Sequence, residues 1–166
     1  FTGLPAGTYQ VEEIYNKDGW WPSYPAVPHA VLLTTGTHVD SLDFGNYQIS
    51  PSMISGSKWN DLNDNGIRDS GEAGISGWKI NLSGKSTASI FTDGDGDYTF
   101  TGLWPGEYIV SETWRMGWRQ TFPPSLGFHT VNVGPEVDLA GFNFGNVSDT
   151  LFSTSFRTFT AESLAL

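Results

Sequence analysis

Oxygen-bearing residues recur at a fixed spacing in one stretch of the chain, from Asp61 to Glu72. Gly66 occupies the sixth position, where a calcium loop must turn sharply. Positions 1, 3, 5, 7, 9 and 12 are held by Asp61, Asn63, Asn65, Ile67, Asp69 and Glu72, with Ile67 offering its carbonyl. Calcium prefers carboxylate, amide and carbonyl oxygens, so this spacing predicts a Ca²⁺ site. The alternative is an ion-free turn, because Asn, Asp and Gly are also common turn residues.

The residues that flank this loop favour strands. Trp78, Ile80 and Leu82 alternate with polar residues, and a period of two is typical of a half-buried strand. We therefore do not expect the two flanking helices of a calcium sensor. The loop is interpreted as a calcium clip that stiffens a β module.

A second acidic stretch places Asp93, Asp95 and Asp97 two residues apart, with glycines between them. Three carboxylates this close repel one another unless a cation or solvent intervenes. A second metal site is one interpretation, and a solvated hairpin turn is the other.

Composition limits the classes of protein that this chain can represent. Its 166 residues carry a net charge of -10, which opposes binding to nucleic acid or to an anionic membrane surface. It has no cysteine, so disulfides are excluded, and no apolar run is long enough for a membrane span. The chain opens on Phe-Thr-Gly-Leu-Pro without a signal-peptide pattern, as we expect of a processed or truncated product.

The sequence repeats itself at an offset near one hundred residues. Phe-Thr-Gly-Leu-Pro-Ala-Gly-Thr-Tyr-Gln-Val at 1–11 returns as Phe-Thr-Gly-Leu-Trp-Pro-Gly-Glu-Tyr-Ile-Val at 100–110. Residues 51–148 then form a complete module, 1–50 the back half of another, and 149–166 a tail. Short alternating strands at 56–60, 77–83, 87–92, 97–103, 107–113, 117–122, 128–133 and 139–145 predict an all-β chain. Its fold class would be tandem β-sandwich modules with the first one incomplete.

The stretch from Lys58 to Glu72, followed by Gly77-Trp-Lys-Ile-Asn-Leu and Leu103-Trp-Pro-Gly-Glu-Tyr, resembles the SdrD-type B repeat of microbial cell-surface proteins. That family is similar to collagen-adhesin B-type (CnaB-like) domains. The resemblance implies an Ig-like or prealbumin-like β-sandwich, calcium binding by the acidic loop, and a structural role in an extracellular protein without enzymatic activity.

Related B-type domains sometimes contain an isopeptide bond between Lys and Asn, promoted by a buried acid. The resemblance assigns the acid to Glu112, the amine to Lys58 and the acyl partner to Asn143 or Asn146. Strand alternation argues against the bond, because Lys58 should point outward if Trp59 points inward.

The tail is rich in Thr, Ser and Phe, and Phe152, Thr154 and Phe156 would share one face of a strand. An incomplete first module would expose unpaired strand edges, which natural proteins cover. The tail is therefore a candidate donor strand for the next molecule, which would produce a filament. The alternative is a chain cut within a domain, with a disordered tail.

Enzyme patterns are weak in this sequence. His29, His38 and His129 lack paired metal-ligand spacing, and there is no Gly-x-Ser-x-Gly nucleophile motif. The seven Trp suggest a second reading as an adhesin or carbohydrate-binding module with a glycan or host-protein ligand, because flat aromatic faces stack on apolar partners. The preferred prediction is a non-enzymatic, extracellular, calcium-stiffened structural module that self-associates.

Overall fold

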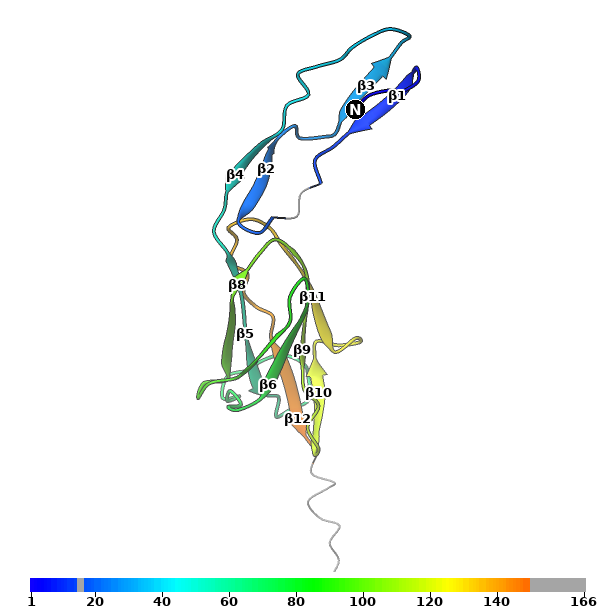
Figure 1. Ribbon diagram of the computed structural model, residues 1–166. Helices are drawn as coiled ribbons and strands as arrows, with labels where there is room; N and C mark the ends of the chain where they lie inside the picture. The colour runs from blue at the N-terminus through cyan, green and yellow to red at the C-terminus, as the bar shows by residue number, and fades with distance from the viewer. Residues whose placement is uncertain (15–16, 150–166) are drawn as a thin grey trace, which may run out of the picture. The chain divides into compact units, whose positions relative to one another are not determined.

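The computed structural model describes residues 1–14 and 17–149 (Figure 1). All regular structure in these residues is β, as predicted, and none of them lies in a helix. None of the described residues forms a helix that could span a membrane. The chain divides into unit 1, Phe1–Pro51, and unit 2, Ser52–Leu166. The proposed donor residues Phe152, Thr154 and Phe156 lie outside the described residues.

Unit 2 is a β-sandwich of two four-stranded sheets that pack face to face (Figure 1). One sheet has the order β10-β12-β5-β8 and the other has the order β11-β9-β6-β7. The strands are β5 Ser52–Asn60, β6 Lys79–Gly84, β7 Ala88–Phe91, β8 Asp97–Leu103, β9 Gly106–Glu112, β10 Trp118–Phe122, β11 Phe128–Val133 and β12 Phe144–Ser148. Only β5 and β12 pair in parallel among these strands.

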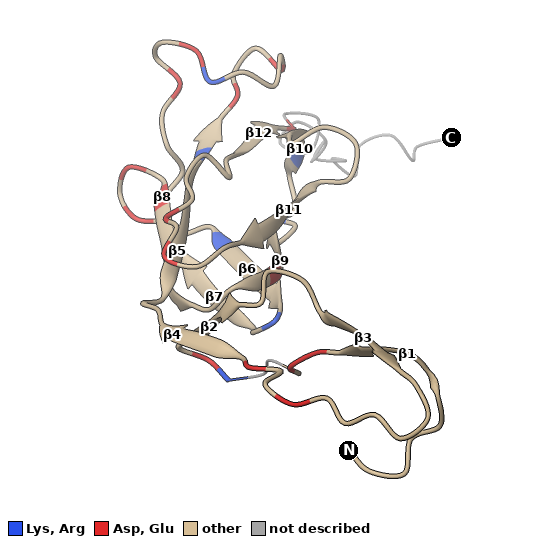
Figure 2. Ribbon diagram, turned by 90° about the horizontal axis from the view of Figure 1, so that it is seen from above, with Lys and Arg blue, Asp and Glu red and all other residues tan. Residues whose placement is uncertain are grey.

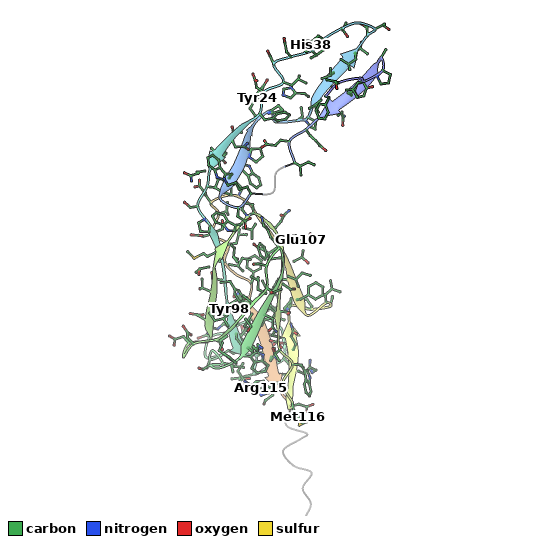
Figure 3. All side chains as sticks on the ribbon, viewed as in Figure 1. Tyr24, His38, Tyr98, Glu107, Arg115 and Met116 are labelled. Atoms are coloured by element: carbon green, nitrogen blue, oxygen red, sulfur yellow. The ribbon has the colours of Figure 1, made fainter. Side chains whose placement is uncertain are left out.

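The core of unit 2 comes from the alternating residues that face the space between the sheets. Tyr98 and Phe100 of β8 are buried there, as are Tyr108 and Val110 of β9. Figure 3 shows Tyr98 among these packed side chains, and its hydroxyl donates a hydrogen bond to the carbonyl of Phe142. Burial of each large apolar side chain contributes ~1.5–3 kcal/mol, which makes this cluster the main source of stability.

Two predicted strands differ from the structure by several residues. The first strand of unit 2 begins at Ser52 and not at residue 56, and the last covers Phe144–Ser148 instead of 139–145. Leu139 forms only an isolated bridge with Ile54, and Gly141 has a φ of 91°, in the left-handed region that breaks a strand. The chain can therefore pair regularly with β5 only after this turn.

Unit 1 contains two separate two-stranded antiparallel sheets. Strand β1, Gly7–Val11, pairs with β3, His29–Leu33, and β2, Trp20–Tyr24, pairs with β4, Gly45–Gln48. Local contacts of unit 2 recur here at the offset of the sequence repeat. Tyr9 donates from its hydroxyl to the carbonyl of Pro5, as Tyr108 does to Trp104. The ring nitrogen Nε2 of His29 lies 2.9 Å from the carbonyl of Asp43, as that of His129 lies 2.8 Å from Asn143.

Candidate calcium loop and buried ion pair

The predicted calcium loop connects β5 to β6 and is tied at both ends to the sandwich. The amide of Asp61 donates to the carbonyl of Asn146 on β12 at 2.9 Å, and the amide of Asn60 donates to the carbonyl of Ala73 at 2.9 Å. Acidic residues mark this loop and the turn that precedes β8 in Figure 2. The loop therefore begins and ends beside the strands of the core.

The carboxylates of Asp61 and Glu72, at the first and last positions of the loop, hold its backbone. Asp61 accepts from the amides of Asn65, at 3.1 Å, and Gly66, at 2.7 Å. Glu72 accepts from Leu62, at 2.8 Å, and from Asp69, at 3.0 Å. Gly66 has a φ of 74°, a conformation that glycine adopts without strain, so the predicted sharp turn lies at the predicted residue.

The middle of the loop brings the remaining predicted ligands together. The side-chain amides of Asn63 and Asn65 each donate to Oδ2 of Asp69 at 2.8 Å. Their oxygens accept from the backbone, Asn63 from the amide of Asn65 and Asn65 from the amide of Ile67. The side chains of Asn63, Asn65 and Asp69 thus form one network.

The donor set of this loop fits a hard cation. Asp61 is fully buried and Glu72 is 8% exposed, yet neither forms an ion pair within residues 1–14 and 17–149. Buried anions are ordinarily paired or bound to a metal. Burial alone would raise the pKa of Asp61, but the neighbouring Thr121 hydroxyl and the amides of Gly66 and Asn65 outweigh it and lower that pKa. Across the described residues, no three His, Cys, Asp or Glu side chains cluster as a metal site, so Asn and carbonyl oxygens would have to complete this one.

Asp93, Asp95 and Asp97 lie in a tight turn between β7 and β8, and the predicted hairpin is wrong because these strands belong to different sheets. Oδ1 of Asp93 accepts from the amides of Asp95, at 3.0 Å, and Asp97, at 2.8 Å. All three residues are exposed and do not gather around a common point in the described part of the chain. The second metal site stays a prediction that this arrangement does not support.

The expected outward orientation of Lys58 is wrong. Lys58 is fully buried, and its Nζ lies 3.1 Å from Oε2 of Glu112, whose side chain is 5% exposed. The ammonium also lies 4.5 Å from the centre of the Trp78 ring and 3.4 Å from the carbonyl of Phe144. The lysine is therefore part of the sandwich interior.

The prediction from strand alternation failed for Lys58 because both faces of β5 are covered. Lys58 faces the core, while Trp59 lies on the other face of β5. The ring centres of Trp59 and Phe122 are 5.7 Å apart, and Trp59 forms a bridge with Gly74, just after the loop 61–72. Trp59 is consequently buried as well. A rule that assumes one solvated face cannot predict which side chains of such a strand point into the core.

Asn146 completes the buried polar group, and Asn143 does not take part in it. The side-chain amide of Asn146, 2% exposed, donates to Oε1 of Glu112 at 2.7 Å. Asn143 instead accepts from the amide of Ser57 at 2.9 Å. Of the four residues assigned to a cross-link, the structure thus gathers Lys58, Glu112 and Asn146, one from each of β5, β9 and β12.

Burial shifts both charged members of this group toward neutrality. Desolvation lowers the pKa of Lys58 to about 8 against the opposing attraction of Glu112. Desolvation also raises the pKa of Glu112, although Lys58 and the amide of Asn146 oppose it. A lysine whose neutral form is accessible near physiological pH is a better nucleophile than an exposed one.

One family model matches part of unit 2. The model of the SdrD B-like domain matches residues 52–127. Unit 2 contains an SdrD B-like domain. The predicted resemblance is confirmed for this segment, and the match ends before β11 and β12.

Curated relatives of this chain are longer proteins whose name describes serine-aspartate repeats. Serine-aspartate repeat-containing protein C of Staphylococcus aureus strain MRSA252 is 35% identical over 152 residues, which cover 84% of this chain and 17% of the relative. The protein of the same name in strain Newman is also 35% identical, with 16% of its length covered. The chain therefore spans about one sixth of the relatives it matches.

Solved structures similar to this chain include two pilins. The streptococcal ancillary pilin aligns with a TM-score of 0.48 and 15% identity, over 86% of this chain and 42% of that one. GBS52, the minor pilin of Streptococcus agalactiae, aligns with a TM-score of 0.43 and 13% identity, over 89% and 63%.

The aromatic residues considered for sugar binding fall into different environments. Trp59 and Trp78 are buried, Trp20 and Trp21 are half-buried, and Trp114 is 73% exposed. Trp59 and Trp78 thus serve packing in unit 2, and the adhesin alternative stays a prediction.

Proposed function

We propose that this chain is a non-enzymatic structural segment of an extracellular surface protein and that calcium in the loop 61–72 stiffens unit 2. The observation that carries the proposal is the pair of buried carboxylates at the two ends of the loop, Asp61 and Glu72, which lack an ion-pair partner in the described residues. A divalent cation held by the predicted oxygens would neutralise them. The name of the curated relatives, serine-aspartate repeat-containing protein C, describes a repeat protein and supports the structural role.

Calcium would act by joining strands that are distant in sequence. The loop begins at the end of β5, hydrogen-bonds to Asn146 of β12 and closes beside Trp59. A cation that binds only the folded loop stabilises the module by ~2.7 kcal/mol at a hundredfold excess over its dissociation constant. Amide hydrogen exchange tests this proposal. The protection of residues 61–73 should rise when calcium is added and should fall back to its calcium-free level after chelation. Protection that is the same with and without calcium would refute the proposal.

A covalent cross-link between Lys58 and Asn146 is a second stiffening device that the buried group favours. Neutral Nζ of Lys58 would attack Cγ of Asn146, a C–N bond would form to the lysine, and the amide nitrogen would leave as ammonia. Glu112, which contacts both residues, is placed to take the proton from the amine and pass it to the leaving group. Intact mass tests the bond, since the linked chain is lighter by one ammonia. An unchanged mass after complete folding would exclude it.

Self-association through unit 1 completes the proposal. Its two sheets have only two strands each in the described residues, so strand edges are left for an added strand. The hypothesis that residues 149–166 of another copy supply this strand predicts polymers that disappear when the tail is removed. Electron microscopy of both chains tests this hypothesis, and a monomer in both samples would contradict it.

A further inference from the structure

The predicted calcium loop contacts β10 as well as the strands on either side of it in the sequence. Asp64, inside the loop, accepts a hydrogen bond at 2.5 Å from the guanidinium of Arg119, and the two side chains form an ion pair. A Cβ added at Gly66 would lie 3.3 Å from the carbonyl oxygen of Thr121, so the turn of the loop packs against the same strand. The hydroxyl of Thr121 also lies beside the carboxylate of Asp61. The loop is therefore held against β10 at several points.

Strand β10 lies at the edge of its sheet. Its only strand partner among the described residues is β12, and the register of this pairing shifts between Gln120 and Phe122. An edge strand is held by fewer backbone hydrogen bonds than a central strand, so contacts outside the sheet contribute more to its local stability. The contacts with the loop are contacts of this kind.

Asp64 does not occupy a ligand position of the loop. It lies between Asn63 and Asn65, which hold positions 3 and 5. Its φ of 61° is in the left-handed region, which Asp and Asn adopt more readily than most other residues. The ion pair with Arg119 thus fixes the backbone between two predicted ligands without using a ligand oxygen.

We infer that Arg119 is a positioning residue for the calcium site. Through Asp64 it holds the loop against β10 in the closed form, by which we mean the packed conformation just described. The inference rests on the proposed calcium site. A contact that favours the closed form in the calcium-free chain lowers the free energy needed to order the loop when calcium binds. By thermodynamic reciprocity, bound calcium should in turn restrain β10.

Charge alone predicts the opposite effect of Arg119 on calcium affinity. A guanidinium near the site repels a divalent cation, so a residue that acted only through its charge would weaken calcium binding, and its removal would tighten it. Removal of a positioning residue weakens binding instead, because the loop is then less ordered. The sign of the change in affinity in Arg119→Gln therefore distinguishes the two roles.

Calorimetric titration of the full chain with calcium tests the inference. Arg119→Gln and Asp64→Asn should each weaken calcium binding about two- to fivefold, the range expected from an exposed ion pair. The double variant should bind about as well as either single variant, because both changes break the same contact. Asn tolerates the left-handed φ of residue 64, so the backbone is preserved. Lys79→Gln, which removes an exposed cation from β6, should leave the affinity unchanged.

Amide hydrogen exchange supplies a readout other than affinity. In the parent chain, calcium should protect β10 more than β11, which is an edge strand of the other sheet. In Arg119→Gln at saturating calcium this excess should disappear, while the protection of the loop persists. Equal or tighter calcium binding by Arg119→Gln, or equal protection of β10 and β11 in the parent, would overturn the inference and leave the proposed calcium site intact. A parent chain that binds no calcium would overturn both.

Discussion

Removal of the Glu112 carboxylate should strongly destabilise unit 2. In Glu112→Ala the ammonium of Lys58 keeps only the carbonyl of Phe144, at 3.4 Å, and the face of Trp78. Loss of one partner from a buried ion pair costs ~3–5 kcal/mol. The destabilisation has an upper limit, because Lys58 can lose its proton instead of staying buried as an unpaired charge. At pH 7, neutralising an amine with an ordinary pKa of 10.5 costs about 4.8 kcal/mol.

The two values agree, so we expect a loss of about 3–5 kcal/mol, or a fall in Tm of at least about 12 °C for a domain of this size. Urea and thermal unfolding of the full chain measure it, and intact mass shows whether a cross-link contributes to the loss. Glu107→Ala, at an exposed residue on the same strand, is the control and should change the stability by less than about 0.5 kcal/mol.

Replacing both partners, in Lys58→Met with Glu112→Leu, should recover most of the loss in a sample that mass shows to be unlinked, because no charge is then buried. A Glu112→Ala variant that unfolds within about 1 kcal/mol of the parent would refute the burial of this pair.

Three further perturbations follow from the same contacts. Glu72→Ala should lower Tm in excess calcium and have a much smaller effect after chelation; equal losses in both conditions would mean that the residue serves only the turn. In Asn146→Ala, where Lys58 stays a free amine, the free energy of unfolding should rise between pH 8 and 10.5. Burial lowers the pKa of Lys58 to about 8, so the unfolded chain binds a proton that the folded chain lacks in that window, and Lys58→Met in the same background should abolish the slope. Gly74→Ala should destabilise the chain by more than about 2 kcal/mol, because its Cβ would lie 1.7 Å from the carbonyl of Asp95, whereas Gly94→Ala meets nothing within 4 Å and should be tolerated.

The turn of the loop 61–72 could be predicted because the information for it is local. Twelve consecutive residues fix the positions of Asp61, Gly66 and Glu72 relative to one another, and the structure brings them together with the expected turn. The core-facing residues of β8 and β9 could also be predicted from the sequence, because each of these strands buries one face in the core.

The buried ion pair could not be oriented from the sequence, because its burial depends on what covers each face of β5. Trp59 and Lys58 point in opposite directions, and both are buried. Phe122 and Gly74 cover Trp59, and neither is near it in the sequence. A local alternation rule has no access to these contacts.

The hydrogen bond from the side-chain amide of Asn46 to Glu13 in unit 1 was missed although a signal for it was present. The repeat that aligns Tyr9 with Tyr108 also aligns Glu13 with Glu112 and Asn46 with Asn146. Extending the repeat to polar positions would have placed an acid and an amide together in unit 1.

Counting the calcium ions bound per molecule is the most direct test of the proposed calcium site. Equilibrium dialysis of the folded chain should recover one ion per molecule, and a variant that lacks both Asp61 and Glu72 carboxylates should recover none. A matched variant that lacks Asp93 and Asp95 should still bind one ion. A folded parent chain that retains no calcium, or a double Asp61 and Glu72 variant that retains as much as the parent, would contradict the central claim.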